Sequence, residues 1–274
     1  MQGLRAFPAC QHASWIHPPV SLMKRLPLFL LCCASALSVA EDKPEPQPGL
    51  EKEATESEEP KFRKEKVEGW GTALDLAGDC KFSAKDNALV MTVPGGTPHD
   101  LSAELKSSTS PRVLRPLSGN FVIQVKVEGE FVPGGESTEP RRSGYRGAGL
   151  VIFADTKNYA RLERATLQWQ GDNPHAYTNF EIRVDGQLER IGTTADAPLD
   201  PHKPTWLRLE RQGKILQGAV SQDGHEWVPL VPKELGDAWK DDTLGGVAAI
   251  STSKEDFTPR YSELTVTDKQ PVTK

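Results

Sequence analysis

The sequence predicts an all-β domain, a jelly-roll sandwich of two antiparallel sheets. Three observations predict it: apolar and polar residues alternate over many short segments, Gly, Pro and Asp separate these segments, and no stretch keeps a helical period. About twelve segments over roughly 200 residues suit two packed sheets. A β-propeller would need internal repeats of about 40–50 residues, and the sequence contains none.

Residues 1–40 are predicted to be an N-terminal extension and a signal peptide, with translation starting at Met23. Two basic residues follow Met23, and an apolar run then leads to a small-residue cleavage site at Ala40, as in secretory signals. The run is too short for a good membrane span, so no transmembrane segment is expected after removal of the signal. The protein is therefore expected to be secreted, periplasmic or in the cell envelope. A lipoprotein carrying its lipid on Cys32 or Cys33 is the alternative.

The chain beyond the signal divides into three parts. Residues 41–66 are rich in Glu, Pro and Lys and poor in apolar residues, which predicts a disordered linker. Residues 67–269 carry the strand patterns and are predicted to form the sandwich, followed by a short tail at 270–274. Cleavage leaves Cys80 as the one cysteine, which excludes an internal disulfide or a zinc site built on cysteines alone. We expect Cys80 to be a small buried residue, not a reactive thiol.

The strand patterns begin with "NALVMTVPGG" and "GNFVIQVKVEGEF", where apolar residues occupy every second position. "GAGLVIFAD" is nearly continuous in apolar residues, which predicts a strand buried on both faces. The first two segments place on one face Leu89, Met91 and Val93, and Phe121, Ile123, Val125 and Val127, respectively. The later strand segments are "NYARLERATLQW", "NFEIRV", "TWLRLERQGKILQGAV", "HEWVPLV", "GGVAAIS" and "YSELTVT".

Taken in this order, five segments resemble a known family. They are "GDCKFSAKDNALVMTVPGGTPHDLSAE", "SPRVLRPLSGNFVIQVKVEGEF", "GAGLVIFADTKNYARLERA", "NFEIRV" and "WLRLERQGKILQGAVSQDGHEW", and they span most of residues 70–266. The chain resembles the secreted concanavalin A-like jelly-roll domains of the regulation-of-enolase-like type. The resemblance implies a β-sandwich and a secreted or cell-envelope location, and it implies no settled activity.

Two adjacent strand segments carry alternating charges that form a candidate site. Arg161 and Glu163 share one face of the first strand, and Glu181 and Arg183 share one face of the second. The charges are interpreted as a solvated salt-bridge ladder, as the polar floor of a ligand site, or as a catalytic pair, Glu163 and Glu181. The laminarinase-type signature Glu-x-Asp-x-x-Glu is absent. Catalysis is also disfavoured because the neighbouring arginines would keep both glutamates ionised, whereas a general acid must hold a proton.

Aromatic residues provide a second candidate site. Trp169 ends a strand before a polar loop, and Tyr177 follows that loop. These two side chains are predicted either to bind a glycan at the sandwich edge or to fold back over the core. Trp70, Trp206 and Trp227 lie in strand patterns and are predicted to belong to the core.

A long arginine-rich loop, "FVPGGESTEPRRSGYRGAGL", is the third candidate. Long loops often carry binding residues, and this one precedes a strand and lacks a phosphate-binding glycine pattern. Its charged and aromatic side chains are interpreted as contacts for an acidic glycan or a protein partner, or as a plain surface loop. They are Arg141, Arg142, Tyr145 and Arg146.

No cofactor or metal ion is predicted. Calcium is the cation that the oxygens of "FADTKN", "GGTPHD" and "WKDDT" would take, but none of these segments has the dense ligand alternation of a calcium loop. The histidines beyond the signal share no metal-ligand spacing. They are His99, His175, His202 and His225. The net charge of −5 argues against a nucleic-acid partner.

The segment "AVSQDGHEWVPL" is predicted to be a hairpin. Asp223 and Gly224 tolerate the positive φ of a two-residue type I′ turn, and this register places Val220 opposite Trp227 on an apolar face. His225 and Glu226 would then point to opposite faces and could not act together on one substrate.

The function predicted from the sequence is that of a secreted, non-catalytic β-sandwich module that binds a carbohydrate or another component of the cell envelope. A glycoside hydrolase or lyase acting through the two glutamates is the first alternative. A structural domain with an envelope protein as its partner is the second.

Overall fold

The computed structural model describes residues 63–268, in which every regular element is a strand. The predicted signal peptide, the linker up to residue 62 and the tail from residue 269 lie outside the described residues. Within residues 63–268 no helix has the length and apolar character needed to cross a membrane. The prediction of an all-β chain is therefore confirmed for this part of the protein.

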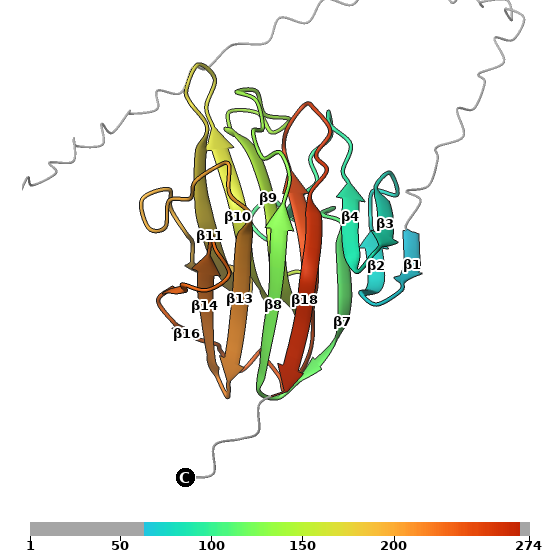
Figure 1. The fold of residues 1–274 in the computed structure, drawn as a ribbon, viewed down its shortest axis with the longest axis vertical. Helices are drawn as coiled ribbons and strands as arrows, with labels where there is room; N and C mark the ends of the chain where they lie inside the picture. The colour runs from blue at the N-terminus through green and yellow to red at the C-terminus, as the bar shows by residue number, and fades with distance from the viewer. Residues whose placement is uncertain (1–62, 269–274) are drawn as a thin grey trace, which may run out of the picture. The chain divides into compact units, whose positions relative to one another are not determined.

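The strands form two large antiparallel sheets, called A and B, that pack face to face (Figure 1). In spatial order, sheet A contains β1 (Arg63–Val67), β2 (Gly71–Asp75), β7 (Arg112–Ser118), β17 (Asp242–Ser251), β9 (Gly144–Phe153), β10 (Tyr159–Gln168), β11 (His175–Val184) and β12 (Gln187–Arg190). Sheet B contains β15 (Val228–Pro229), β14 (Ile215–Ser221), β13 (Thr205–Gln212), β8 (Phe121–Glu128), β18 (Arg260–Asp268), β4 (Ala88–Thr92) and β3 (Lys81–Lys85), with β16 (Lys233–Glu234) paired to β14.

The main core lies between the two sheets and follows the alternation of the sequence. In β8 every second residue is buried, from Phe121 to Val127, and the residues between them are half-buried. The inward side chains of β10 and β11, such as Leu162 and Phe180, meet those of β8 and β13 in one apolar cluster. The jelly-roll sandwich that the sequence predicts is confirmed.

A second, smaller apolar cluster lies on the outer face of sheet A, the face turned away from sheet B. Residues 98–110, called the cover segment, cross this face and contain the short hairpin of β5 (Leu101–Ser102) and β6 (Ser107–Ser108). Leu101 packs there against Val151 and Tyr159. This second cluster explains why β9 is buried on both faces, as its nearly continuous apolar run predicts.

Strand β1 starts at Arg63, inside the segment assigned to the linker from the sequence. Residues 63–66 are exposed, so their composition carries no apolar signal. Their backbone nevertheless pairs in register with β2, from Arg63 opposite Asp75 to Val67 opposite Gly71. Backbone hydrogen bonds, not burial of side chains, therefore place this edge strand in the sheet.

The hairpin predicted at Asp223-Gly224 is wider than expected. β14 ends at Ser221 and β15 starts at Val228, so residues 222–227 connect them. Val220 pairs with Val228, not with Trp227. The type I′ turn is wrong because Gly224 has a φ of 79° while Asp223 stays outside the positive region.

The side chain of Asp223 closes this connection instead. Its Oδ1 accepts hydrogen bonds of 2.8 Å from the backbone amides of His225 and Glu226, and one of 2.9 Å from the hydroxyl of Ser221. The two backbone hydrogen bonds are the main cause that lowers the pKa of the Asp223 carboxyl to about 2. Hydrogen bonds between the Asp223 carboxylate and nearby backbone amides thus replace the two-residue turn that the sequence predicts.

Two of the three tryptophans assigned to the core lie elsewhere. Trp70 is buried as predicted, but Trp206 and Trp227 are half-buried on the outer face of sheet B. The ammonium of Lys126 lies 4.9 Å from the ring of Trp206, and the guanidinium of Arg208 lies 3.8 Å from the ring of Trp227. The sequence of β13 already indicates this position, because side chains alternate between the two faces of a strand. Trp206 falls on the same face as Arg208 and on the opposite face from the buried leucines.

Gly224→Ala should lower the free energy of unfolding by about 1–2 kcal/mol or more, because an L-residue at this φ is strained. The new Cβ would also meet the Trp206 ring at 3.2 Å. Gly213→Ala is the matched control, since Gly213 has a φ of 56° with no neighbouring atom within 4 Å of a Cβ. Urea denaturation of both variants measures the difference. Equal losses would contradict a role for the Trp206 contact.

Candidate functional site

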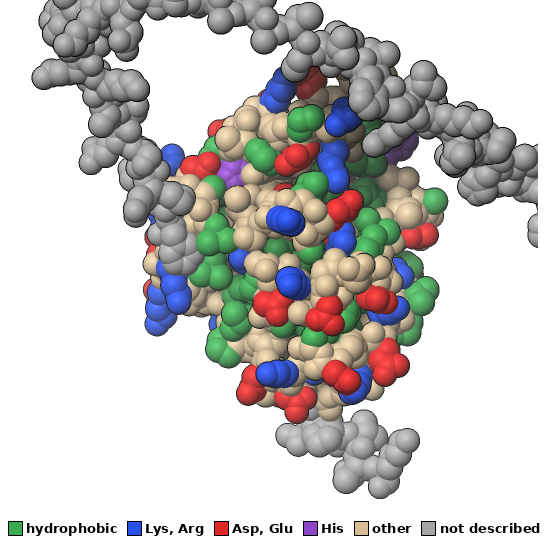
Figure 2. Space-filling view, turned by 180° about the vertical axis from the view of Figure 1, so that it is seen from behind, with side chains coloured by type: hydrophobic (Ala, Val, Ile, Leu, Met, Phe, Trp, Pro, Cys, Tyr) green, Lys and Arg blue, Asp and Glu red, His purple; other side chains and the backbone are tan. Residues whose placement is uncertain are grey.

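A cavity of about 530 Å³ opens on the outer face of sheet A, beside the cover segment. Figure 1 has sheet B nearer the viewer, and Figure 2 shows the opposite side, where basic, acidic and apolar side chains are interspersed. Strands β9, β10 and β11 supply the floor, and the loops before β9 and after β12 supply the walls. The residues that line the cavity include Asp100, Arg142, Tyr145, Arg161, Trp169, Tyr177, Asn179 and Ile191.

A larger hollow of about 800 Å³ lies around β7, β17 and the loop after β9. Within residues 63–268, none of the buried side-chain atoms that lack a hydrogen-bond partner belongs to the residues lining this hollow. The smaller cavity does contain such an atom, on Arg161. Because unsatisfied buried polar atoms favour a polar ligand, we take the smaller cavity as the candidate site.

The charges predicted on β10 and β11 form a buried cluster beneath the cavity. The register places Arg161 opposite Glu181, and Arg161 Nη2 lies 2.5 Å from Glu181 Oε2. Arg183 Nε donates to Glu181 Oε1 at 2.8 Å. Burial alone would raise the pKa of Glu181, but the charge of Arg161 and the hydrogen bonds of both arginines outweigh it and lower that pKa. The cluster is thus buried, and the predicted solvated ladder is wrong because the cover segment excludes water.

Glu163 differs from Glu181 in its surroundings. Its Oε2 accepts hydrogen bonds from Tyr145 at 2.9 Å and from Asn179 at 3.0 Å, while Arg161 Nε is 3.7 Å away. Its Oε1 is buried without a hydrogen-bond partner. Burial outweighs the charge of Arg161 and raises the pKa of the Glu163 carboxyl.

The hydrogen bond between Tyr145 and Glu163 depends on a glycine. Tyr145 lies across Gly147 of the same strand, and a Cβ on Gly147 would be 2.8 Å from two atoms of the Tyr145 ring and hydroxyl. Any larger residue at this position would push the tyrosine away from Glu163. The small residue in "YRGAGL" therefore shapes the floor of the cavity.

Arg161 connects the buried charges to the cavity. It lines the cavity, and its Nη1 is buried without a hydrogen-bond partner, with Asp100 Oδ1 the nearest carboxylate at 3.7 Å. Burial is the main cause that raises the pKa of Asp100. A ligand oxygen that accepts a hydrogen bond would satisfy Arg161 Nη1.

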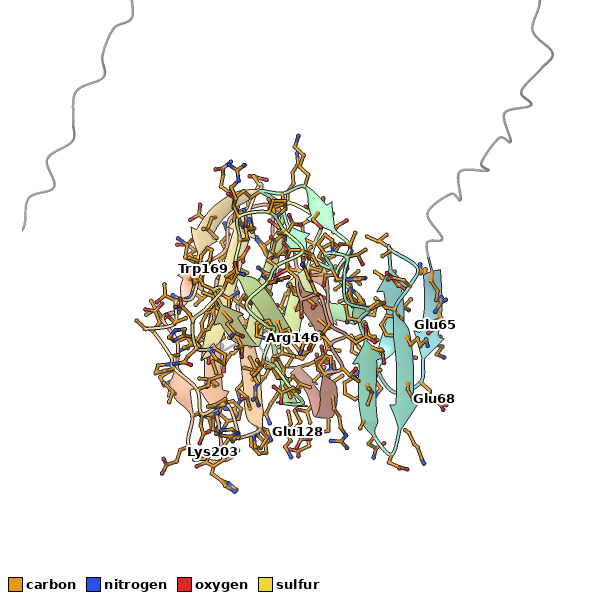
Figure 3. The ribbon with its side chains drawn as sticks, turned by 90° about the horizontal axis from the view of Figure 1, so that it is seen from above. Glu65, Glu68, Glu128, Arg146, Trp169 and Lys203 are labelled. Atoms are coloured by element: carbon orange, nitrogen blue, oxygen red, sulfur yellow. The ribbon has the colours of Figure 1, made fainter. Side chains whose placement is uncertain are left out.

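The aromatic residues predicted for a glycan site border the same cavity. Trp169 is 50% exposed at the end of β10, while Tyr177 is buried in the wall. Ile191, also 50% exposed, stands on the loop after β12. Seen from above, Trp169 lies near the periphery and Arg146 in the interior (Figure 3). Trp169 therefore does not fold back over the core, whereas Tyr177, 7% exposed, is buried as that alternative expects.

The structure thus brings together most of the side chains singled out in the sequence. Arg161, Trp169 and Tyr177 line the cavity, and Glu163 and Glu181 lie beneath its floor. Arg183 lies at the edge of the buried cluster, where its Nη2 is 3.7 Å from Glu104 of the cover segment.

The arginine-rich loop divides between two places. Arg142 and Tyr145 line the cavity. Arg146 instead points into the sandwich, where it donates to the backbone oxygens of Glu255 and Asp256.

Three of the cavity residues named above were not assigned to a binding site from the sequence: Asp100, Asn179 and Ile191. Asn179 lies opposite Glu163 in the register and on the same face of β11 as Glu181. The alternation of "NFEIRV" could therefore have placed Asn179 beside the charged residues. Asp100 reaches the cavity because the cover segment crosses the sheet, and no local pattern indicates this.

The oxygens considered for calcium are mostly committed to the protein. In "FADTKN", Asp155 accepts hydrogen bonds from the backbone amides of Lys157 and Asn158 and from the side chain of Asn158. In "GGTPHD", Asp100 accepts from the amide of Leu101. The fold brings together a different group of candidate metal ligands, Asp79 and Cys80 from the loop before β3 and His99 from the loop before β5.

No family model matches the chain, and no curated protein matches it. Among solved structures, a functionally unknown protein from Saccharomyces cerevisiae is similar over 69% of this chain and 92% of its own, with 17% identity and a TM-score of 0.52. The chain is a jelly-roll sandwich. The resemblance to the regulation-of-enolase-like family stays a prediction.

Two further solved structures match at lower similarity. A CBM66 carbohydrate-binding module from Bacillus subtilis is similar over 70% of this chain and 92% of its own, at 12% identity and a TM-score of 0.40. A xylan β-1,4-xylosidase from Bacillus halodurans C-125 matches at 15% identity and a TM-score of 0.44. The match covers 67% of this chain and 38% of the xylosidase.

Glu181→Gln should lower the free energy of unfolding at pH 7 by about 3–5 kcal/mol, because it leaves two buried arginines without their shared carboxylate. Urea denaturation across pH measures the loss. Since the pKa of Glu181 is lower in the folded chain, its contribution is present above the unfolded value of about 4.3 and disappears as the pH falls through the folded value. The difference between variant and wild type should therefore shrink below about pH 4.

Glu163→Gln is the matched control for this experiment. Burial raises the pKa of Glu163, so its charge is disfavoured in the folded chain, and its removal should cost markedly less than removal of the Glu181 charge. An equal or larger loss in Glu163→Gln would contradict the assignment of Glu181 as the main partner of Arg161.

Proposed function

We propose that the chain is an extracytoplasmic carbohydrate-binding β-sandwich whose ligand lies in the cavity on the outer face of sheet A. One observation carries the proposal: the cavity combines a half-exposed indole, Trp169, with a buried guanidinium nitrogen of Arg161 that has no hydrogen-bond partner. The signal-peptide pattern that ends at Ala40 supports the extracytoplasmic location.

The cavity offers both kinds of surface that a sugar presents. A pyranose or furanose ring has an apolar face of C–H groups, which stacks on aromatic rings such as Trp169. Its hydroxyls both donate and accept hydrogen bonds, and the cavity supplies a donor from Arg161 and an acceptor from Asp100. An apolar wall with a few convergent polar groups is the usual composition of a small-ligand site.

The positions of the two glutamates favour binding over hydrolysis. Glycoside hydrolases need two carboxyl groups that flank the scissile bond, one of them protonated. Two arginines hold Glu181 ionised, and neither Glu163 nor Glu181 belongs to the lining of the cavity. The rigid cluster instead holds Arg161 in a fixed orientation toward the ligand, which reduces the entropy cost of binding.

Trp169→Ala should weaken glycan binding by about tenfold or more, because loss of a buried aromatic contact of about 1.4 kcal/mol corresponds to a factor of ten. A glycan array of neutral and uronic-acid oligosaccharides identifies the ligand, and calorimetry then measures its affinity for the full chain and the variant. Trp227→Ala is the matched control, since this tryptophan lies on the outer face of sheet B, and should bind like the wild type.

Binding that survives Trp169→Ala and Arg161→Lys but not Trp227→Ala would move the site to sheet B. No binding to any polysaccharide class would overturn the proposal and favour a protein partner. Release of reducing ends from a bound oligosaccharide would favour the hydrolase.

A further inference from the structure

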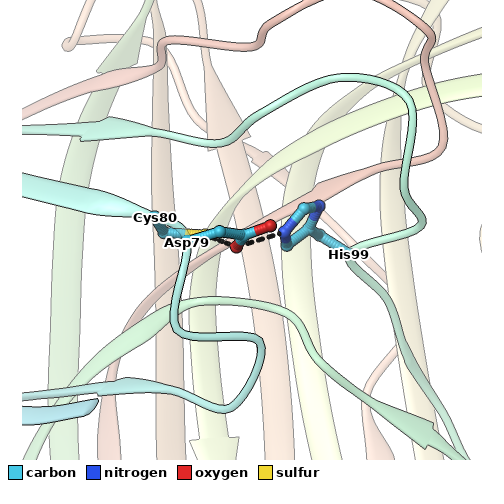
Figure 4. Close-up of side chains that lie close together, drawn as sticks. All are labelled: Asp79, Cys80 and His99. Carbon is cyan, nitrogen blue, oxygen red and sulfur yellow. Dashed lines mark hydrogen bonds and ion pairs between the residues drawn. The ribbon is translucent and has the colours of Figure 1, made fainter. Parts of the chain in front are cut away.

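We propose that Asp79, Cys80 and His99 form a binding site for one Zn²⁺ ion. Their side chains come from two loops, one before β3 and one before β5, and lie close together, with Asp79 Oδ1 hydrogen-bonded to both Cys80 and His99 (Figure 4). A carboxylate oxygen, a thiol sulfur and an imidazole nitrogen are the three ligand atoms, and they lie within 4.8 Å of one another. Nitrogen, sulfur and oxygen together form a ligand set typical of zinc.

Two of the three distances between the ligand atoms lie near those expected around a tetrahedral ion. For Zn–N and Zn–O bonds of about 2.0–2.2 Å and a Zn–S bond of about 2.3 Å, ligand oxygen and sulfur lie about 3.6 Å apart, and oxygen and nitrogen about 3.3 Å. Cys80 Sγ is 3.5 Å from Asp79 Oδ1, and His99 Nε2 is 2.9 Å from the same oxygen. These two distances differ from the tetrahedral values by about 0.1 and 0.4 Å, and the sulfur and nitrogen lie within 4.8 Å of each other.

The second nitrogen of His99 favours metal coordination. His99 Nδ1 lies 3.2 Å from the backbone oxygen of Thr97, and because a carbonyl can only accept, Nδ1 carries the proton. In the neutral form of the ring, Nε2 then carries a lone pair 2.9 Å from Asp79 Oδ1. A proton or a metal ion must lie between these two acceptors. Metal-bound histidines are commonly oriented by such a hydrogen bond to a carbonyl.

The backbone around the three ligands is held in place before any ion binds. Asp75, fully buried, accepts hydrogen bonds of 2.9 Å from the backbone amides of Gly78 and Cys80, which sets the turn carrying Asp79. His99 exchanges two backbone hydrogen bonds with Ser251 of β17. A preorganised ligand set of this kind binds a metal without paying for the ordering of its loops.

The exposure of the three residues leaves one side from which a metal ion can enter the site. Cys80 and His99 are fully buried, while the side chain of Asp79 is 39% exposed. An ion can therefore enter from the Asp79 side and keep a water molecule as its fourth ligand. Burial and the nearby carboxylates raise the pKa of the Cys80 thiol, which excludes it as a nucleophile, and Zn²⁺ would supply the positive charge that deprotonates it.

The test uses the full chain, stripped of metal with a chelator and titrated with ZnCl₂ in a calorimeter. One saturable equivalent is expected, with a rise in Tm of roughly 5–10 °C when free Zn²⁺ is about 100 times Kd. Co²⁺ in place of Zn²⁺ should produce a thiolate-to-cobalt charge-transfer band. Cys80→Ser should abolish this band and weaken Zn²⁺ binding more than about 100-fold, since loss of an outer partner alone costs 10–100-fold.

Three further variants complete the test. His99→Gln and the partly exposed Asp79→Asn should also weaken binding, and Asp79→Asn keeps the test valid if a buried variant fails to fold. His225→Gln is the control, because His225 is exposed, and should bind Zn²⁺ like the wild type. The absence of saturable Zn²⁺ binding would overturn the site. So would binding that Cys80→Ser, His99→Gln and Asp79→Asn leave unchanged, since the cysteines before residue 41 are common to all variants.

Discussion

The ion pairs of Arg161 are the interaction on which the candidate site depends. The fold buries Glu163 and Glu181 on one face of sheet A, and a buried carboxylate is tolerated only with a partner of opposite charge or with hydrogen bonds. Arg161 lies between the two and pairs with both. Its remaining nitrogen, Nη1, has no hydrogen-bond partner in the protein and lies 3.7 Å from Asp100 Oδ1, so the group that neutralises the buried charge also offers a donor to the cavity.

The cover segment creates the environment in which these charges matter. Without residues 98–110 the outer face of sheet A would be an exposed, charged surface, where ion pairs contribute little. Leu101 packs on this face and accepts a hydrogen bond from Tyr159, and Asp100 forms part of the cavity wall. His99 precedes this wall directly, so an ion held by His99 and Cys80 would also anchor the start of the cover segment. The proposed zinc site and the cavity are in this way joined by one stretch of chain.

The sequence predicted the elements well where one physical effect dominated. Alternating apolar residues in β8 and the continuous apolar run of β9 identified strands and their burial, because side-chain direction in a strand has a period of two. It failed where a local polar contact competed. Asp223 closes its connection with a carboxylate in place of a type I′ turn, and Trp227 stacks on Arg208 instead of entering the core. The contacts of Asp223 are local, whereas the contact of Trp227 needs a partner from another strand, which composition does not name.

By itself the sequence determined the fold class, the succession of the main strands along the chain and the shared faces of the charges on β10 and on β11. Neighbouring antiparallel strands place Arg161 beside Glu181 through local register alone. Only the tertiary structure decided that these charges are buried, because that depends on a segment some sixty residues earlier in the chain crossing the sheet. It alone also brought Cys80 to His99. Sequence patterns report periodicity within an element, whereas a cavity or a metal site is made by elements that meet after folding.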